Sequence, residues 1–270
     1  MGYVQSLKPG VTETSRGFDK YERFGAYHWD MGNSDRLYME HVAYIQSVFA
    51  SAKRVYSETT ILDVGCGDGY IAGKLAELGL TVHAIDMNSE AIRLAEDKCA
   101  SLEVTGQIEF ESEDFFRLRK APPFILASDV LEHLYKPEQF VDKLVNLSPT
   151  VALISTPLKR RDGRLWDPDY HVTEFSEEEL KELFACMIDD YGITYAVHPK
   201  EAEYRTQYIL LEKRTRALKS LLNEMELYTA SIRMGASRRS KFAFEMLGDG
   251  EVDEVCGRIS ELFALRIIED

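Results

Sequence analysis

The chain has 270 residues, of which 45% are hydrophobic, and a formal net charge of −14 at pH 7. This composition suits one large domain with an appended piece, and its acidity predicts neither a general nucleic-acid-binding surface nor attraction to anionic membranes. The four cysteines are far apart, no segment reaches transmembrane length, and no signal sequence is recognisable, so we expect a cytoplasmic protein without a disulfide framework.

Aromatic side chains crowd together ahead of the first predicted strand, from Phe18 to Trp29. A helical repeat of apolar residues follows over Arg36–Val55. We interpret residues 1–55 as a helical segment that either covers a binding site or seals one end of the core. His28 lies between two large rings and is a candidate active-site residue.

The central stretch of the chain runs from Ile61 to Tyr70 and contains three glycines, Gly65, Gly67 and Gly69. An apolar run ends in this turn, and a helical pattern begins at once and continues to Leu78, which predicts the strand, turn and helix of a nucleotide-binding unit. Glycine is needed where the backbone takes positive φ and passes close to a ligand. We therefore expect a ligand to lie across these glycines.

Two carboxylates, Asp63 and Asp68, frame this turn and would repel the pyrophosphate of a dinucleotide. The spacing also differs from the usual G-x-G-x-x-G, which disfavours a dehydrogenase. The segment Leu62–Gly69 resembles the first motif of the class I S-adenosylmethionine-dependent methyltransferases. This resemblance implies a Rossmann-like, seven-stranded, mostly parallel α/β sheet, with S-adenosylmethionine as cofactor and S-adenosylhomocysteine as product.

The next two predicted strands supply further candidates for cofactor binding. Thr81–Ile85 ends at Asp86, where a nucleotide-binding unit places an acidic residue on the ribose hydroxyls, although a helix-capping role is also open. After the strand Gln107–Glu111, the resemblance places Asp114 and Phe115 against the adenine, the alternative being a solvated acidic turn. The full predicted cofactor set is Asp63, Gly65, Cys66, Gly67, Asp68, Gly69, Asp86, Met87, Asn88, Asp114, Phe115, Ser128 and Asp129.

The buried strand predicted over Phe124–Ala127 leads into a polar segment that ends in Glu132 and His133. This segment resembles the fourth motif of the ubiquinone-biosynthesis O-methyltransferase group, which implies that His133 lies near the transferred methyl. A histidine can remove the proton of an acceptor hydroxyl, and Glu132 could orient it. His28 and His171 are further candidates, and a purely structural role for His133 stays open.

The remaining elements complete the predicted domain. A strand over Val151–Ser155 is followed by a polar loop, a helix starting at the capping box of Ser176, and an antiparallel pair formed by Ile193–Val197 and Gln207–Leu211. Two helical repeats follow, from Leu218 to Ile232 and from Val252 to Phe263. We divide the chain into residues 1–55, a methyltransferase domain at 56–213, and a C-terminal helical extension at 214–270 that could form a homodimer contact.

The predicted reaction is methylation of a hydroxyl on a small molecule, such as a sugar or a phenol, without a metal ion or a nucleic-acid partner. Three alternatives remain: an N-methyltransferase acting on a small amine, a non-enzymatic cofactor-binding partner protein, and a metal-dependent RNA 3′-terminal 2′-O-methyltransferase. The last rests on a resemblance in which Asp129, Glu132 and His133 would join His171 as metal ligands.

Overall fold

The computed structural model describes residues 18–104, 106–198, 204–214 and 243–247. Its centre is a sheet in the order β3-β2-β1-β4-β5-β7-β6-β8. Strands β1 to β5 run parallel, and β7 lies antiparallel between β5 and β6, as predicted for a seven-stranded, mostly parallel sheet. The strands are β1 Thr60–Val64, β2 Thr81–Asp86, β3 Ile108–Ser112, β4 Phe124–Ser128, β5 Val151–Pro157, β6 Tyr191–His198, β7 Thr206–Lys213 and β8 Ala243–Leu247.

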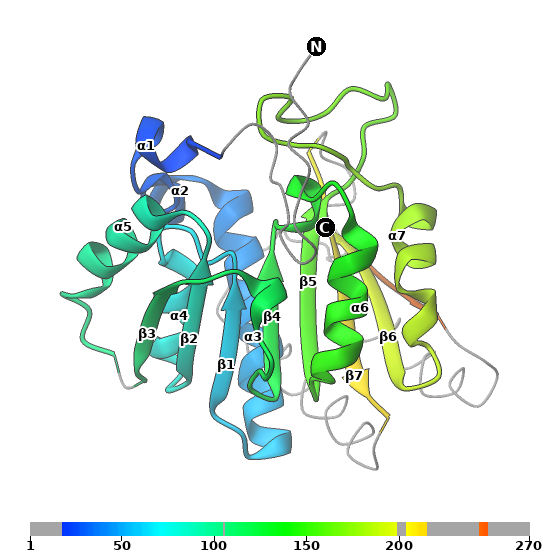
Figure 1. The fold of residues 1–270 in the computed structure, drawn as a ribbon, viewed down its shortest axis with the longest axis horizontal. Helices are drawn as coiled ribbons and strands as arrows, with labels where there is room; N and C mark the ends of the chain where they lie inside the picture. Colours follow the sequence, from blue (N-terminus) through cyan, green and yellow to red (C-terminus); the bar gives the residue numbers. More distant parts are fainter. Residues whose placement is uncertain (1–17, 105, 199–203, 215–242, 248–270) are drawn as a thin grey trace, which may run out of the picture.

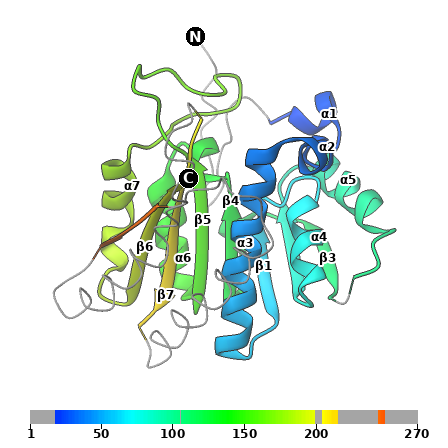
Figure 2. The ribbon, with the colours of Figure 1, turned by 180° about the vertical axis from the view of Figure 1, so that it is seen from behind.

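Helices cover both faces of the sheet, so that the domain has three layers (Figures 1 and 2). One face carries α3 (Arg36–Tyr56), α4 (Tyr70–Glu77) and α5 (Ser89–Cys99), and the other carries α6 (Pro137–Leu147) and α7 (Glu177–Phe184). Successive side chains of a strand point to opposite faces, so Ile61 packs in the first apolar cluster and Leu62 in the second. The sheet is therefore buried on both sides, as its continuous apolar strands require.

Three of the helices, α3, α5 and α7, begin directly after a residue whose side chain caps them. Asp35 accepts hydrogen bonds from the amides of Leu37 and Tyr38 and caps α3. The side chain of Asn88 caps α5 in the same way. Ser176 and Glu179 form the predicted capping box of α7, which satisfies amide groups that the helix itself cannot pair.

Three segments lie over the carboxyl ends of the parallel strands, at the top of Figure 1. They are α1 (Lys20–Phe24), α2 (Tyr27–Ser34) and the loop of residues 158–176 between β5 and α7. Short 3₁₀ helices occur at η1 (Phe115–Arg117), η2 (Leu131–His133) and η3 (Ala185–Met187). The aromatic residues from Phe18 to Trp29 thus lie in or beside two short helices at the edge where ligands bind in open α/β sheets.

The C-terminal part of the chain differs from its prediction in one described segment. Ala243–Leu247 forms β8 and pairs antiparallel with β6, which adds an eighth strand inside the predicted helical extension. Both predicted C-terminal helices, and the dimer contact predicted through them, lie outside the described residues. Within the described ranges, no helix is both long and apolar enough to cross a membrane.

Candidate active site

A cavity of about 930 Å³ opens at the carboxyl ends of β1, β2 and β4. Its volume lies at the upper end of the range for ligand pockets, which leaves room for a cofactor and an acceptor together. All of the predicted cofactor-binding residues except Gly67 and Gly69 line it. The four predicted catalytic residues, His28, Glu132, His133 and His171, line it as well.

The glycine turn has the backbone conformation that its sequence predicts. Gly65, Gly67 and Gly69 have φ values of +69°, +56° and +77°. A Cβ on Gly69 would lie 2.8 Å from the Cβ of Ala95, so a side chain there would clash with α5, and Gly69 does not line the cavity. A Cβ on Gly67 would lie 2.0 Å from the hydroxyl of Tyr21, whose side chain covers the turn.

Buried carboxylates form the cofactor end of the cavity. Asp63 is 2% exposed, and its Oδ2 has no hydrogen-bond partner. Burial raises the pKa of Asp63 to about 7, and the negative charge of Asp86 adds to the rise. Asp86 accepts hydrogen bonds from the amides of Gly67 and Asn88, at 3.0 and 2.8 Å, and burial raises its pKa too. A buried oxygen without a donor fits the amino group of S-adenosylmethionine.

Asp68 is fully buried and joins the turn to α2. Its Oδ2 accepts the amide proton of His28 at 2.9 Å, and its Oδ1 lies 3.2 Å from Nδ1 of the same histidine. The indole of Trp29 donates to its backbone carbonyl. These contacts hold His28 beside the glycine turn.

Asp114 and Phe115, which we predicted to contact the adenine, are buried and do not form a solvated turn. Asp114 is 8% exposed and accepts the amide proton of Phe116, whereas its Oδ2 has no hydrogen bond and lies 3.6 Å from Arg117 Nε. Phe115 is 5% exposed and packs against Phe140. Asn88 rather than Asp86 caps α5, so the capping alternative for Asp86 is wrong.

The sequence did not predict a buried series of hydrogen bonds beside β4. His41 of α3 contacts the hydroxyls of Tyr208 and Ser128, both at 2.8 Å, and burial lowers its pKa. The signal for His41 was its place on the apolar stripe of its helix, four residues after Leu37 and four before Ile45. Other cavity residues that the sequence did not indicate are Tyr38, His198, Tyr204, Thr206 and Tyr208.

The backbone bends sharply where β4 ends. Asp129 has a φ of +54°, which is strained for a residue with a side chain. Its amide donates to the Ser155 carbonyl, and its Oδ1 accepts the hydroxyl proton of Ser155 at 3.1 Å. This bend directs the chain into η2, which presents Glu132 and His133 to the cavity.

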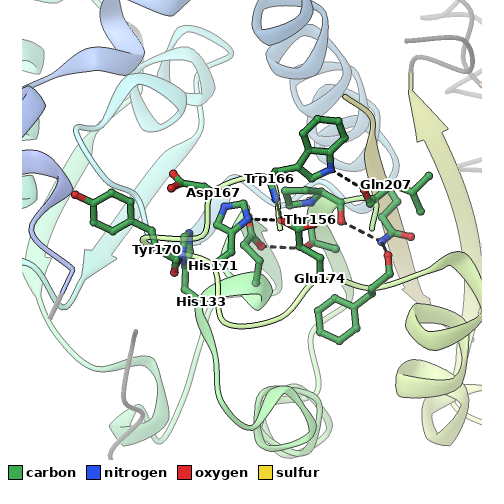
Figure 3. Close-up of polar contacts among 12 residues, drawn as sticks. His133, Thr156, Trp166, Asp167, Tyr170, His171, Glu174 and Gln207 are labelled. Atoms are coloured by element: carbon green, nitrogen blue, oxygen red, sulfur yellow. Dashed lines mark hydrogen bonds and ion pairs between the residues drawn. The ribbon is translucent and has the colours of Figure 1, made fainter. Parts of the chain in front are cut away.

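Glu132, His133 and His171 lie close together on the wall of the cavity, and Figure 3 shows the two histidines together with their partners. Burial raises the pKa of Glu132, as do the charges of Asp129 and Glu174, and Thr156 donates to its Oε2 at 2.9 Å. Burial lowers the pKa of His133 to about 4, so its imidazole is neutral and weakly basic at pH 7.

A family model described as "Methyltransferase domain" matches residues 33–186, more than half of the chain. The chain belongs to this methyltransferase family. Methyltransferases of this family take their methyl group from S-adenosylmethionine. The carboxylates and glycines described above thus lie in an S-adenosylmethionine-dependent methyltransferase domain.

Two curated relatives of this methyltransferase domain carry the name ubiquinone biosynthesis O-methyltransferase. The mitochondrial protein of Schizosaccharomyces pombe is 28% identical over 151 residues, which cover 53% of this chain and 54% of that protein. The protein of Nitrosomonas europaea is 23% identical over 146 residues, covering 51% and 60%. The chain therefore spans only about half the length of the relatives it matches.

The fold is also similar to the crystal structure of magnesium protoporphyrin IX methyltransferase from Synechocystis PCC 6803 with bound S-adenosylhomocysteine. The TM-score is 0.56 at 16% identity, and the match covers 72% of this chain and 97% of that chain. At this identity the similarity establishes the methyltransferase fold alone.

Proposed function

We propose that this chain transfers the methyl group of S-adenosylmethionine to a hydroxyl oxygen of a small molecule. The observation that carries the proposal is the convergence of Glu132, His133 and His171 at one end of a cavity whose other end holds the glycine turn. Burial raises the pKa of the Glu132 carboxyl, which makes its carboxylate the strongest base of the three, and the two imidazoles beside it can accept a hydrogen bond from a hydroxyl. A neutral amine acceptor would need no such group.

Binding and orientation of the cofactor fall to residues around the turn. Asp86 has lone pairs left for ribose hydroxyls after accepting two backbone amides, because each carboxylate oxygen can accept more than one hydrogen bond. Asp114 offers Oδ2 to an amino group, and Asp63 offers its own free oxygen to a cation. When bound, the cofactor supplies an electrophilic methyl group on a positively charged sulfur.

The chain itself aligns the acceptor and excludes water. Methyl transfer to oxygen is accelerated mainly by holding the two reactants in line in a dry site. The aromatic rings of Phe18, Tyr21 and Tyr170 close this end of the cavity, and Phe18 packs edge-on against His133 at 5.0 Å between ring centroids. Nδ1 of His133 lies 2.9 Å from the Tyr170 carbonyl, which assigns the proton to Nδ1 and leaves Nε2 able to accept one.

The charge of the cavity supports a small, uncharged or cationic acceptor. Among the described residues that line it, Lys20 is the single lysine or arginine, and it forms an ion pair with Asp167 at 3.0 Å. A nucleic acid would need several cations along its backbone. The RNA alternative is therefore less well supported than a phenol or a sugar.

The proposal is tested with methyl-labelled S-adenosylmethionine and a panel of phenols, catechols, sugars, small amines and a short RNA. We expect label to appear in an alkali-stable ether of a hydroxylated small molecule, with the rate lowered by Glu132→Gln. Glu109→Gln on the exposed edge of the sheet is the matched control. Label found only in amines or only in RNA would refute O-methylation of a small molecule.

A further inference from the structure

A series of hydrogen bonds runs along the α3 side of the cavity, from Tyr208 to Asp129. His41 contacts the hydroxyls of Tyr208 and Ser128, each at 2.8 Å. The hydroxyl oxygens of Ser128 and Ser155 lie 3.1 Å apart, and Ser155 also contacts Asp129 Oδ1 at 3.1 Å. Tyr208, His41 and Ser128 line the cavity, so this series forms part of its wall.

The direction of these hydrogen bonds follows from the carboxylate at one end. A carboxylate only accepts, so the single hydroxyl proton of Ser155 goes to Asp129. Ser128 then donates to Ser155, and Nε2 of His41 donates to Ser128. Burial lowers the pKa of His41, so its ring is neutral and its Nδ1 accepts the proton of Tyr208. Ser128 thus accepts one hydrogen bond, donates one, and keeps one lone pair for a ligand.

Packing holds the His41 imidazole in this orientation. His41 is 5% exposed, and its ring centroid lies 6.1 Å from that of Tyr38 and 5.6 Å from that of Tyr208. Helix α3 lies in front of the sheet in Figure 2, and its first two turns carry Tyr38 and His41 to the cavity. A side chain fixed by two hydrogen bonds and two neighbouring rings holds Ser128 in place before any ligand arrives.

Tyr38 adds a second hydroxyl to this wall. It is 9% exposed and lines the cavity, and no hydrogen bond among the described residues involves its hydroxyl. Burial raises the pKa of Tyr38, and the charge of Asp68 adds to the rise, so the hydroxyl keeps its proton. A largely buried hydroxyl without a partner is costly unless a ligand pairs with it. Tyr38 therefore offers a donor and an acceptor to a ligand.

The charges around this wall disfavour a charged ligand. Among the described residues that line the cavity, Lys20 is the single lysine or arginine, and it is paired with Asp167. An anion here would meet the carboxylate of Asp129 without a cation to offset it. A cation would be repelled by the positive sulfur of the bound cofactor in the same cavity. A hydroxyl, which is uncharged and both donates and accepts, matches Ser128 and Tyr38.

Resting on the proposed function, we propose that Ser128 and Tyr38 bind a second, non-reacting hydroxyl of the acceptor, and that His41 positions Ser128 for this contact. The acceptor is then an uncharged molecule with at least two hydroxyls, such as a sugar or a polyphenol, and carries no carboxylate or phosphate. Because Ser128 is also a predicted cofactor residue, this subsite borders the cofactor. A second hydroxyl held there fixes the position of the reacting one.

Binding of matched probes to the full chain, saturated with S-adenosylhomocysteine, is measured by ligand-detected NMR. Methyl glucoside is paired with glucuronate, and 3,5-dihydroxybenzyl alcohol with 3,5-dihydroxybenzoate, so that the pairs distinguish a sugar from a polyphenol. We expect the uncharged member of at least one pair to bind at least about tenfold more tightly than its anionic partner. Equal or tighter binding of the anions, or no binding of either uncharged probe, would overturn the proposal.

Substitutions locate the contact. Tyr38→Phe and Ser128→Ala should each weaken binding of the uncharged probe about 3- to 10-fold, whereas Ser128→Thr keeps the hydroxyl and the affinity. Tyr135→Phe and Ser112→Ala are the matched controls, because both side chains are exposed and neither lines the cavity. Tyr38→Phe removes only an oxygen from a packed ring, so it tests the contact even if Ser128→Ala lowers stability. Full probe affinity in Tyr38→Phe and Ser128→Ala would refute the subsite.

The positioning role of His41 is tested by ¹⁵N NMR of its imidazole, identified by the signals lost in His41→Gln. We expect a neutral ring at pH 7 with its proton on Nε2, and a probe affinity in His41→Phe lowered about as much as in Ser128→Ala. A charged ring, or a proton on Nδ1, would overturn the assigned direction and the positioning role with it.

Methyl-labelled cofactor separates this proposal from the proposed function. Methylation of an oxygen in the anionic probes, without preference for the uncharged ones, would overturn the subsite and leave the proposed function standing. Methyl transfer to amines alone, with selective binding of the uncharged probes retained, would overturn O-methylation and leave the subsite standing.

Discussion

The affinity for S-adenosylmethionine should depend on pH through Asp63. This side chain is 2% exposed, lines the cavity and has a pKa raised to about 7 by burial and by Asp86. If its carboxylate binds the cofactor's cation, the protonated form binds poorly. The dissociation constant then scales with one plus the ratio of protonated to ionised Asp63. It should be about tenfold larger at pH 6 than at pH 8, and about 100-fold larger at pH 5.

The raised pKa of Asp63 also predicts how the free energy of unfolding depends on pH. The folded-state pKa lies above the value near 3.8 for an unperturbed carboxyl, so the folded chain holds its proton more tightly than the unfolded chain. The free energy of unfolding of the cofactor-free chain should therefore fall as the pH rises from about 4 to about 7. The shift corresponds to at most about 4 kcal/mol.

The assay is calorimetric titration with the cofactor at pH 5, 6, 7 and 8, together with urea unfolding at each pH. Asp63→Asn should bind the cofactor weakly at every pH and lose this part of the stability slope, whereas Asp142→Asn on the exposed side of α6 should behave as wild type. A dissociation constant that is flat from pH 5 to 8, or full affinity in Asp63→Asn, would refute the assigned contact.

Three other substitutions test the turn and the sheet. The positive φ of Gly67 alone should make Gly67→Ala lower the free energy of unfolding by about 1–2 kcal/mol. The clash of the new Cβ with the hydroxyl of Tyr21 should lower it further. Gly163→Ala has a similar φ of +73° and no neighbour within 4 Å, so thermal unfolding of both separates strain from clash. Equal effects would contradict the clash. Glu212 accepts a hydrogen bond from the Tyr56 hydroxyl, and burial raises its pKa to about 8. Because the folded chain therefore holds this proton more tightly than the unfolded chain, the free energy of unfolding should fall as the pH rises from about 4.5 to 8. Glu212→Gln should remove that slope in urea unfolding, and an unchanged slope would rule out Glu212 as its source.

Local patterns were enough to predict most of the residues that line the cavity near the glycine turn. The strand, glycine turn and helix are consecutive in the chain, so residue types and spacing specify them without knowledge of the fold. The place of Asp86 beside the turn was predicted from the same unit, because parallel strands end at one edge of the sheet and Asp86 is the last residue of β2. Gly69 shows the limit of this reasoning, since a Cβ there would meet Ala95 of α5 and the residue does not line the cavity.

The acceptor end depends on contacts that no local pattern contains. His41 and Tyr208 are 167 residues apart in sequence and meet only because α3 packs across the sheet onto β7. His171 was a candidate from resemblance, but its partner Glu174 and its place beside His133 require the loop to fold over η2. Asp129 was expected among the metal ligands of the RNA alternative, and the fold turns it toward Ser155 instead.

The central claim is that S-adenosylmethionine occupies the carboxylate-lined turn between β1 and α4. Its most direct test is calorimetric titration of the full chain with S-adenosylmethionine, S-adenosylhomocysteine and NAD, repeated with Asp86→Ala and with the exposed Asp97→Ala as control. We predict micromolar binding of the first two compounds, lost in Asp86→Ala and kept in Asp97→Ala, with no binding of NAD. Binding of NAD, or cofactor affinity that Asp86→Ala leaves unchanged, would contradict it.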